Sequence, residues 1–448
     1  MPKNYTVDEV SDQLRVSKRT ILREIKRGNL EAKKAGRRYL ISDEVIKRYT
    51  KAEGDKDLDL KIDQFLKSKK GEMVDLLQKM VSMHSESEGN NDNSDIAQII
   101  SQKMESLGIR NSVLSQKDAL IMRASYGYAE EGLLITCPLN VAPVGNIASW
   151  TFPPFGGVIK GGKMYGRGTA YSKAGIVAAL YALSALKKFV EEDNLRVELV
   201  FDDSQIDKYG GMKVALRRGL YANAGIIGHA TKENYLILGC RGCHQYTFKT
   251  KGLCANTGSD EKRGVNAVEK MARFISEMKK QQLINSDNEK RDQSLSMNFS
   301  YVSGGQKNNI VPDMCESVLD VYTTKDIDKE DVDEVISAVV EKLKNKDKDF
   351  SIESERNFGS DAYSVNDTNN IVTSLEQSAE KVFDDKPSKC VSSDSNVGTI
   401  LSEVGVPSVV FGPNGGNAYS YDEYIEIDSL TQTAQVYALT AMKYFGIE

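Results

Sequence analysis

The chain has 448 residues, of which 40% are hydrophobic and 27% charged, with a formal net charge of −5. This composition predicts a folded protein of about three domains and excludes a chain dominated by disorder. The sequence has no run of 18 apolar residues and begins with a polar segment, so we expect a cytoplasmic protein without membrane contact.

The charge is unevenly distributed along the chain. Residues 1–51 contain 14 Lys plus Arg and 7 Asp plus Glu, a local net of 14 − 7 = +7, which leaves −5 − 7 = −12 for the remainder. Such asymmetry predicts a basic module attached to an acidic body. The 6 cysteines are scattered, as expected in a reducing compartment.

Residues 1–51 are predicted to form three short helices with a hairpin between the second and third. Thr6 and Glu9 have the spacing of a capping box at the first helix. Ser17 is the expected cap of the second helix, and Gly28 is the expected stop. The apolar residues Ile21, Leu22 and Ile25 are expected to face inward.

Basic residues gather on two parts of this module. On the outer face of the second helix we expect Lys18, Arg19, Thr20 and Arg23, and on the hairpin Lys33, Lys34, Arg37 and Arg38. The pattern over residues 5–51 is similar to the winged helix-turn-helix of excisionases and MerR-type proteins. That resemblance implies binding to double-stranded DNA, with the helix residues in the major groove and the wing on phosphates. The alternative is a solvated basic face on a protein-interaction module.

Residues 52–69 are charged and predict a linker or connecting helix. From residue 70, short apolar runs alternate with helical patterns, which predicts an α/β domain with a doubly wound, mainly parallel sheet. We expect it to comprise residues 70–240 and 358–448. A strand-helix-strand-strand-helix-strand pattern predicts an inserted α+β domain over residues 241–357.

The segment 136–175, TCPLNVAPVGNIASWTFPPFGGVIKGGKMYGRGTAYSKAG, resembles the co-catalytic zinc amidohydrolases related to acetylornithine deacetylase, succinyl-diaminopimelate desuccinylase and carboxypeptidase G. The resemblance implies their zinc-exopeptidase-like fold and continues to the C-terminus. The motif frame is kept at ten positions: Val141, Pro143, Trp150, Pro154, Phe155, Gly166, Arg167, Gly168, Lys173 and Gly175.

The same resemblance implies that the functional side chains are replaced. Metal ligands or the residue that orients one would stand at Pro138, Asn140, Tyr171, Gln205, His229 and Tyr419, and the general base at Ser204. On the inserted domain, Asn256 replaces a histidine and Tyr322 an arginine. Because several of these positions follow predicted strands, we expect Pro138, Tyr171, Gln205 and His229 to converge on one cleft.

These residue types are poor zinc ligands, because zinc binds imidazole, carboxylate or thiolate. The chain has only 3 histidines, His84, His229 and His244, and His229 alone matches a ligand position. We therefore predict an inactive hydrolase domain without a metal cofactor. The alternative is a rebuilt site drawn from Cys137, Asp202, Asp203 and His229. Residues 240–244 match the C-x-x-C-H haem signature, which we interpret as coincidence, with a zinc or redox pair left open.

The resemblance also implies that residues 241–357 act as a lid and dimerise. The candidate ligand-binding residues are Arg241, Asn309, Gly416 and Asn417. The leading hypothesis is a dimeric DNA-binding regulator whose inactive domain senses a small molecule. One alternative is a hydrolase with an unusual metal site, in which zinc would be the cofactor. Another is an excisionase-like structural DNA-binding protein.

Overall fold

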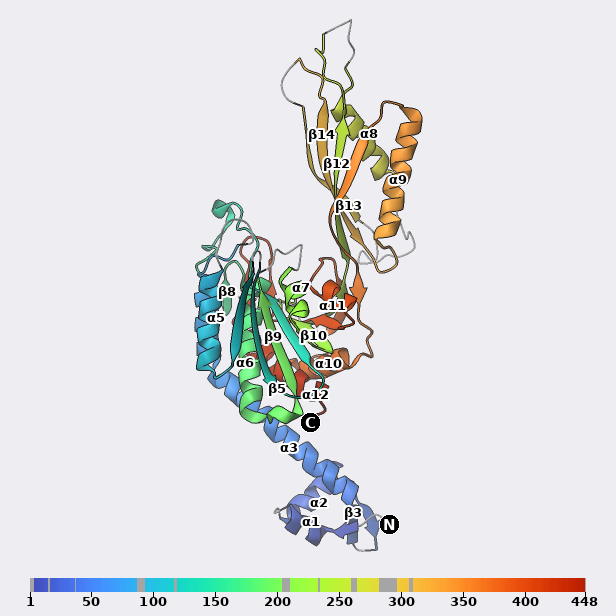
Figure 1. Cartoon of the computed structure of the whole chain (residues 1–448). Coiled ribbons are helices and arrows are strands. Elements are labelled where there is room, and N and C mark those ends of the chain that lie inside the picture. The colour runs from blue at the N-terminus through green and yellow to red at the C-terminus, as the bar shows by residue number, and fades with distance from the viewer. Residues whose placement is uncertain are drawn as a thin grey trace.

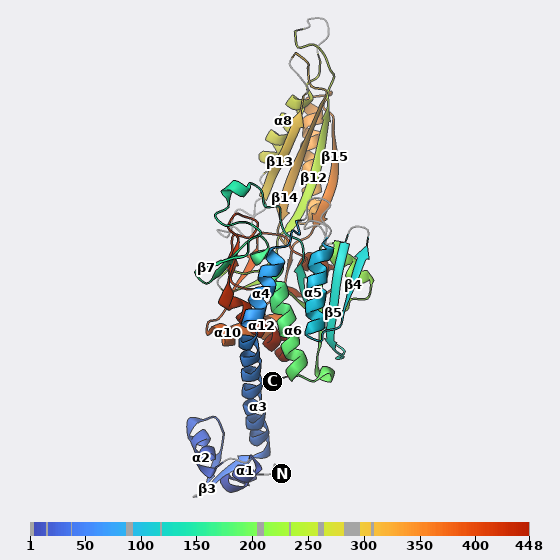
Figure 2. The ribbon, with the colours of Figure 1, turned by 90° about the vertical axis from the view of Figure 1, so that its left-hand side faces the viewer.

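A computed structural model describes residues 4–14, 17–36, 38–86, 93–116, 119–203, 210–232, 234–258, 264–281, 296–305 and 309–447, without the side chains of residues 27 and 50–57. Three bodies follow one another along a line (Figure 1). A small N-terminal module is joined by one long helix to a large α/β domain, and a lid projects from the opposite end. The quarter-turn view in Figure 2 shows the same order.

The N-terminal module consists of β1 (Asn4–Thr6), α1 (Val7–Gln13), α2 (Lys18–Arg27), β2 (Lys33–Ala35) and β3 (Arg38–Ser42), with sheet order β1-β3-β2. The predicted capping box is confirmed, since Glu9 N donates to Thr6 Oγ1 and Thr6 N donates to Glu9 Oε2. Ser17 caps α2 and Gly28 ends it with φ = +79°, as expected. Ile21 is buried, but Leu22 is 38% exposed, so its inward placement was wrong.

Helix α3 (Asp43–Ser68) is one continuous helix of 26 residues, capped by Ser42. The predicted linker therefore belongs to the same helix as the predicted third helix of the module. Its first turns contribute Ile46 to the core of the N-terminal module, whereas Ile62 and Leu66 lie in the core of the large domain. An Asp59–Lys381 ion pair adds a second contact with that domain. Helix α3 therefore packs against both the N-terminal module and the large domain.

The large domain contains a nine-stranded sheet of order β16-β11-β18-β10-β6-β9-β5-β4, with β17 beside β11. The strands β18 (Ser408–Val410), β10 (Ala224–Ile227), β6 (Leu133–Pro138) and β9 (Arg196–Asp202) run parallel at its centre. The flanking pairings of β9 with β5 and of β11 with β18 are antiparallel, so the sheet is mixed. The flanking strands are β4 (Asn111–Gln116), β5 (Ala119–Gly127), β11 (Tyr235–Cys240), β16 (Tyr363–Ser364) and β17 (Ser388–Ser392).

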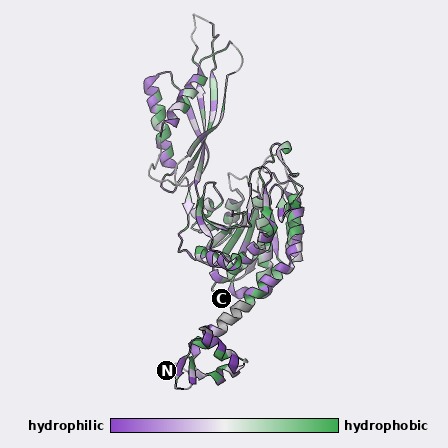
Figure 3. Cartoon of the chain, turned by 180° about the vertical axis from the view of Figure 1, so that it is seen from behind, coloured by the Kyte–Doolittle hydropathy of each residue, from purple (hydrophilic) through white to green (hydrophobic). Residues whose placement is uncertain are grey.

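Helices cover both faces of this sheet because successive side chains along its central strands point to opposite faces, and the side chains on both faces are apolar. Leu133 and Ile135 pack in one cluster with α3 and five further helices: α4 (Lys70–Val81), α5 (Ser94–Ser106), α6 (Ala174–Phe189), α10 (Asn370–Phe383) and α12 (Ile427–Tyr444). Leu134 packs on the other side with α7 (Gly210–Arg217) and α11 (Gly398–Glu403). The helical span Thr169–Phe189 is long and apolar enough to cross a membrane, but 94% of its apolar window is buried inside the protein. Figure 3 shows this concentration of apolar residues in the large domain.

A second sheet of order β19-β20-β8-β7 lies in the same domain. It contains β7 (Val158–Lys160), β8 (Lys163–Tyr165), β19 (Gly415–Gly416) and β20 (Tyr424–Glu426). Because β20 pairs with β8, the C-terminal motif region lies beside the turn that follows β8.

The lid is the predicted α+β domain. Its elements are β12 (Gly242–Lys251), α8 (Ala267–Lys279), β13 (Ser296–Gly304), β14 (Met314–Thr323), α9 (Lys329–Lys346) and β15 (Ile352–Ser360). The antiparallel sheet has the order β13-β14-β12-β15, and α8 and α9 pack with it around Phe248, Phe274 and Leu319. The last strand extends to Ser360, beyond the expected boundary at residue 357.

Candidate functional site

The turn between β8 and α6 forms the centre of the predicted site. Gly168 has φ = +87°, and a Cβ there would lie 2.6 Å from Val141 Cγ1, so both the backbone and the space favour glycine. Gly175 faces the end of β10, where a Cβ would lie 1.5 Å from Gly228 O. The retained glycines of the motif therefore allow close backbone packing at the carboxyl ends of β6 and β10.

A buried ion pair fixes this turn. Arg167 Nη1 lies 2.7 Å from Glu423 Oε2, and both side chains are at most 2% exposed. Glu423 Oε1 accepts hydrogen bonds from the backbone N–H groups of Gly168, Ala170 and Tyr171, at 3.1, 2.8 and 2.9 Å. Burial raises the pKa of the Glu423 carboxyl, and the Tyr171 N–H and the Arg167 guanidinium oppose that shift. We did not predict this role of Glu423, although it lies in the DEY motif at residues 422–424.

Lys173 anchors the same turn to α4. Its Nζ donates to Met80 O at 2.8 Å and to Met83 O at 2.9 Å, at and just beyond the C-terminal end of that helix. Desolvation lowers the pKa of this fully buried amine to about 7. The two carbonyls give Lys173 a structural role at the C-terminal end of α4.

Three of the replaced positions meet in an aromatic cluster, defined here as Tyr171, His229 and Tyr419. The Tyr171 ring centroid lies 5.2 Å from that of His229 and 4.8 Å from that of Tyr419. Tyr171 and His229 are half-buried, and Tyr419 is 40% exposed with φ = +63°. Desolvation lowers the pKa of His229 to about 4, so its ring is neutral near pH 7.

The other replaced positions have different surroundings. Pro138 ends β6, and its carbonyl accepts a hydrogen bond from Ser172 Oγ at 2.9 Å, which places it beside the cluster. Asn140 is fully buried. The predicted convergence is therefore observed for Pro138, Tyr171 and His229. Ser204 and Gln205 lie outside the described residues.

The donor chemistry of these residues does not fit a zinc site. Two phenols and one imidazole occupy three of the positions, while Cys137 Sγ is fully buried and bonded to Gly228 O at 3.3 Å. Burial raises the pKa of the Cys137 thiol well above its usual range, which disfavours the thiolate that zinc requires. Asp203 accepts from Leu120 N at 2.5 Å and from Asn93 Nδ2 at 3.2 Å. Within the described ranges, no three His, Cys, Asp or Glu side chains are grouped as metal ligands.

The remaining histidines pack in other parts of the molecule. His84 stacks on Phe155 at 3.8 Å between ring centroids and stays largely exposed. His244 is fully buried in the lid strand β12, near Thr323 and Asp361. These contacts give the two histidines packing roles, one against the segment that precedes β7 and the other within the lid.

The candidate ligand-binding residues lie in three separate settings. Arg241 is buried between β11 and β12, where its Nη2 donates to Tyr322 O at 3.1 Å. Asn309 is exposed on the lid, and its carbonyl accepts from Thr257 N beside Asn256. Gly416 is in β19, and Asn417 follows it in the loop that carries Tyr419.

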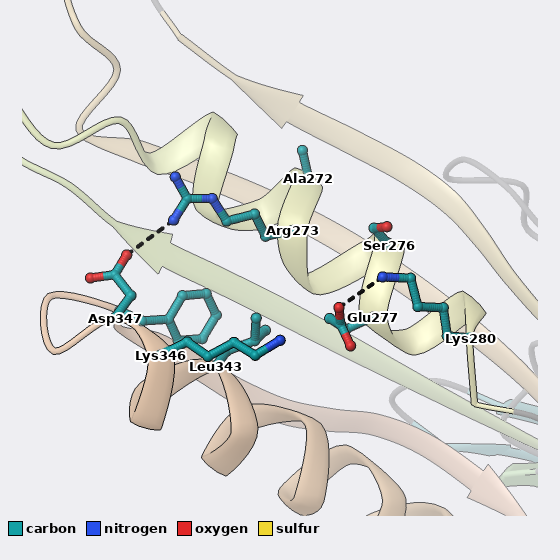
Figure 4. A pocket seen from close by; sticks show the side chains of 9 residues that line it. Ala272, Arg273, Ser276, Glu277, Lys280, Leu343, Lys346 and Asp347 are labelled. Atoms are coloured by element: carbon teal, nitrogen blue, oxygen red, sulfur yellow. Dashed lines mark hydrogen bonds and ion pairs between the residues drawn. The ribbon is translucent and has the colours of Figure 1, made fainter.

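The lid also has a cavity of about 490 Å³ between α8 and α9 (Figure 4). Two ion pairs line it, with Arg273 Nη1 at 3.2 Å from Asp347 and Lys280 Nζ at 2.9 Å from Glu277, and Lys346 is a further charged side chain of the lining. Lys342 also contacts Glu277, and together with Lys280 it lowers the pKa of the Glu277 carboxyl to about 2.

The N-terminal module presents the predicted basic residues at its surface. Arg19, Lys33, Lys34 and Arg38 are exposed. Lys18 pairs with Asp8 at 2.9 Å and Arg23 with Glu24 at 3.6 Å, yet both basic side chains remain about 60% exposed. Thr20 differs, because its hydroxyl bonds Ser17 Oγ at 2.9 Å and takes part in the helix cap. Arg37 lies outside the described residues.

Comparisons with known proteins match two parts of the chain. A family model described as Peptidase family M20/M25/M40 matches residues 140–443, and a helix-turn-helix domain model matches residues 5–53.

Curated relatives and solved structures match the same region. A probable succinyl-diaminopimelate desuccinylase of Staphylococcus epidermidis is 29% identical over 160 residues, covering 35% of this chain and 39% of the relative. One from Staphylococcus aureus is 23% identical over 408 residues, covering 83% and 97%. The M20 family metallo-carboxypeptidase Sso-CP2 of Sulfolobus solfataricus superposes with a TM-score of 0.68 at 18% identity, covering 84% and 99%.

Proposed function

The chain belongs to the peptidase family M20/M25/M40, and we propose that it is a DNA-binding regulator whose peptidase-like domain no longer hydrolyses substrates. We further propose that this domain dimerises and senses a small amino-acid-like or peptide-like molecule in the cytoplasm. The aromatic cluster carries the proposal, because tyrosine rings occupy two positions that would otherwise provide metal ligands. The match of residues 5–53 to a helix-turn-helix domain model supports the proposed DNA binding.

The lid surface supports a dimer. Strand β13 is at the edge of the lid sheet and exposes Tyr301 and Val302, at 49% and 51%. An exposed apolar edge strand is a favourable pairing surface for a second copy. A dimer of this kind would present two recognition helices to a two-fold-related operator.

The first experiment is an electrophoretic mobility shift with the DNA upstream of the protein's own gene. We expect a shift at low salt that is lost when Arg19 and Arg23 are both changed to alanine. No shift at low salt, or an unchanged shift in the double variant, would overturn the DNA-binding role.

The second experiment measures metal content and hydrolysis on the same preparation. We expect substoichiometric zinc, manganese and cobalt, and no turnover of N-acyl amino acids or dipeptides. Stoichiometric metal together with turnover would instead support a hydrolase with a non-standard metal site. The retained Arg167–Glu423 frame is the observation that favours this alternative.

A purely structural role on DNA is the third candidate, favoured by the excisionase-like pattern of the N-terminal module. DNA bending that does not respond to any amino acid or peptide would support it over a regulator.

A further inference from the structure

The aromatic cluster has the chemistry of a cation-binding surface as well as that of a packing unit. Tyr171 comes from the turn before α6, His229 follows β10, and Tyr419 lies in the loop after β19. Three segments distant in the sequence thus present ring faces at the carboxyl ends of parallel strands, where ligands bind in open α/β sheets. The rings are not sealed in the core, since Tyr419 is 40% exposed.

The electrostatic surroundings favour a positive ligand. An aromatic face carries partial negative charge and attracts ammonium and guanidinium groups within about 6 Å of the ring centroid. Asp202 ends β9 directly beside Pro138 and is more than nine-tenths buried, with its Oδ2 facing the first turn of α7, where a Cβ at Gly211 would lie 2.2 Å away.

The buried cations nearest in sequence are already engaged. Arg167 is neutralised by Glu423, and Lys173 Nζ is directed to the carbonyls of Met80 and Met83. The anion-binding N–H groups of the turn are likewise occupied by Glu423 Oε1. The backbone N–H groups of this turn are therefore not available to bind an anionic ligand.

We propose that Tyr171, His229 and Tyr419 form the recognition surface for a small organic cation, an ammonium or guanidinium group on a compact apolar framework. The inference rests on the proposed sensing function and specifies its ligand class. The ligand's positive charge would lie over the rings at positions where active relatives hold metal ions.

The test uses the full-length protein after dialysis against a chelator, with residual metal quantified. The probes are choline and its uncharged isostere 3,3-dimethylbutan-1-ol, which share shape but differ in charge. Titration calorimetry gives the affinities, and the choline methyl resonance reports ring contact. We expect choline to bind roughly tenfold more tightly than the alcohol, because a desolvated cation–π contact is worth about 1–2 kcal/mol.

Substitutions of Tyr171 and Tyr419 test whether these rings contact choline. Tyr171→Leu and Tyr419→Leu should each weaken choline binding by about tenfold, whereas Tyr171→Phe and Tyr419→Phe should retain it. Tyr128→Leu, at a tyrosine that is 62% exposed outside the cluster, should leave binding unchanged. Equal affinity for the two probes, or no choline binding, would overturn the proposal without any variant. Unchanged binding in both leucine variants would overturn it as well.

The outcomes separate this inference from the proposed function. A DNA shift together with equal binding of both probes overturns the cation site alone. Choline discrimination in a protein that does not shift DNA overturns the DNA-binding role alone.

Discussion

Arg167 and Glu423, 256 residues apart in the chain, form a buried ion pair with 2.7 Å between Nη1 and Oε2. The pair joins the turn before α6 to the residue that precedes strand β20, and the same carboxylate also accepts hydrogen bonds from three backbone N–H groups. The turn before α6 and the segment that enters β20 are thus held together as one structural unit.

The first prediction concerns this pair. Arg167→Met should reduce the free energy of unfolding by about 3–5 kcal/mol, because it leaves the Glu423 carboxylate buried without its counter-ion. Urea denaturation followed by circular dichroism measures the change. Lys251→Met is the matched control, since it breaks an ion pair with Glu353 in which both side chains are about 60% exposed, and should cost less than about 1 kcal/mol. Equal losses in the two variants would contradict a structural role for Arg167.

A second prediction tests the attachment of α3 to the large domain. Leu66→Ala should destabilise that domain by about 2–5 kcal/mol, because it opens a cavity at a side chain that is 1% exposed. Leu60→Ala on the same helix, at a side chain that is 52% exposed, should change stability by no more than about 0.5 kcal/mol. Similar effects of the two variants would show that α3 does not dock as described.

The third prediction concerns DNA. Arg19→Ala should weaken binding by about 1–3 kcal/mol if the guanidinium reads a base edge. Lys33→Ala on the wing should instead lower the dependence of log K on log salt by about one unit, the signature of a lost phosphate contact. Binding titrations at several salt concentrations measure both effects. Lys79→Ala, at an exposed lysine of α4, is the control and should change neither quantity.

A fourth prediction follows from His229. Its pKa is lowered to about 4 in the folded protein, whereas an unfolded histidine titrates near about 6.5. Between these values the unfolded chain binds a proton that the folded chain does not, so this group costs stability as the pH falls. At pH 5, His229→Gln should remove up to about 2 kcal/mol of acid-induced destabilisation relative to pH 7.

The control for that prediction is His84→Gln, at a side chain that is 64% exposed. Unfolding free energies at pH 7 and pH 5 should differ by the same amount in this variant and in the unchanged protein. If His229→Gln also leaves the difference unchanged, the ring is hydrated in the folded state.

Much of the fold could be predicted because its signals are local. The capping box at Thr6, the stop at Gly28 and the order of elements in the lid follow from residue types at fixed short spacings. One local prediction was wrong. Leu22 has an apolar side chain yet is exposed. For the charged segment after residue 51, which was predicted as a linker or a connecting helix, the structure shows the helix, continuous with the third helix of the module. Helical periodicity does not specify which neighbouring elements will cover each face.

The candidate site likewise has features that the sequence predicts and features that it does not. The residue types at Pro138, Tyr171 and Tyr419, which are poor zinc ligands, can be read from the sequence. The mutual contact of Tyr171, His229 and Tyr419 is not visible there, and neither is the use of Glu423 to fill the turn. These residues are far apart in the chain, and only the parallel sheet and the pairing of β8 with β20 bring them together.

The sequence by itself therefore determined the basic helix-turn-helix and the α/β body with its inserted lid, since each depends on residue type and near-neighbour spacing. The tertiary structure alone decided that Tyr171, His229 and Tyr419 form one aromatic cluster and that helix α3 joins the N-terminal module to the large domain. Both depend on long-range packing, in which the burial of one segment is set by another that is distant in the chain.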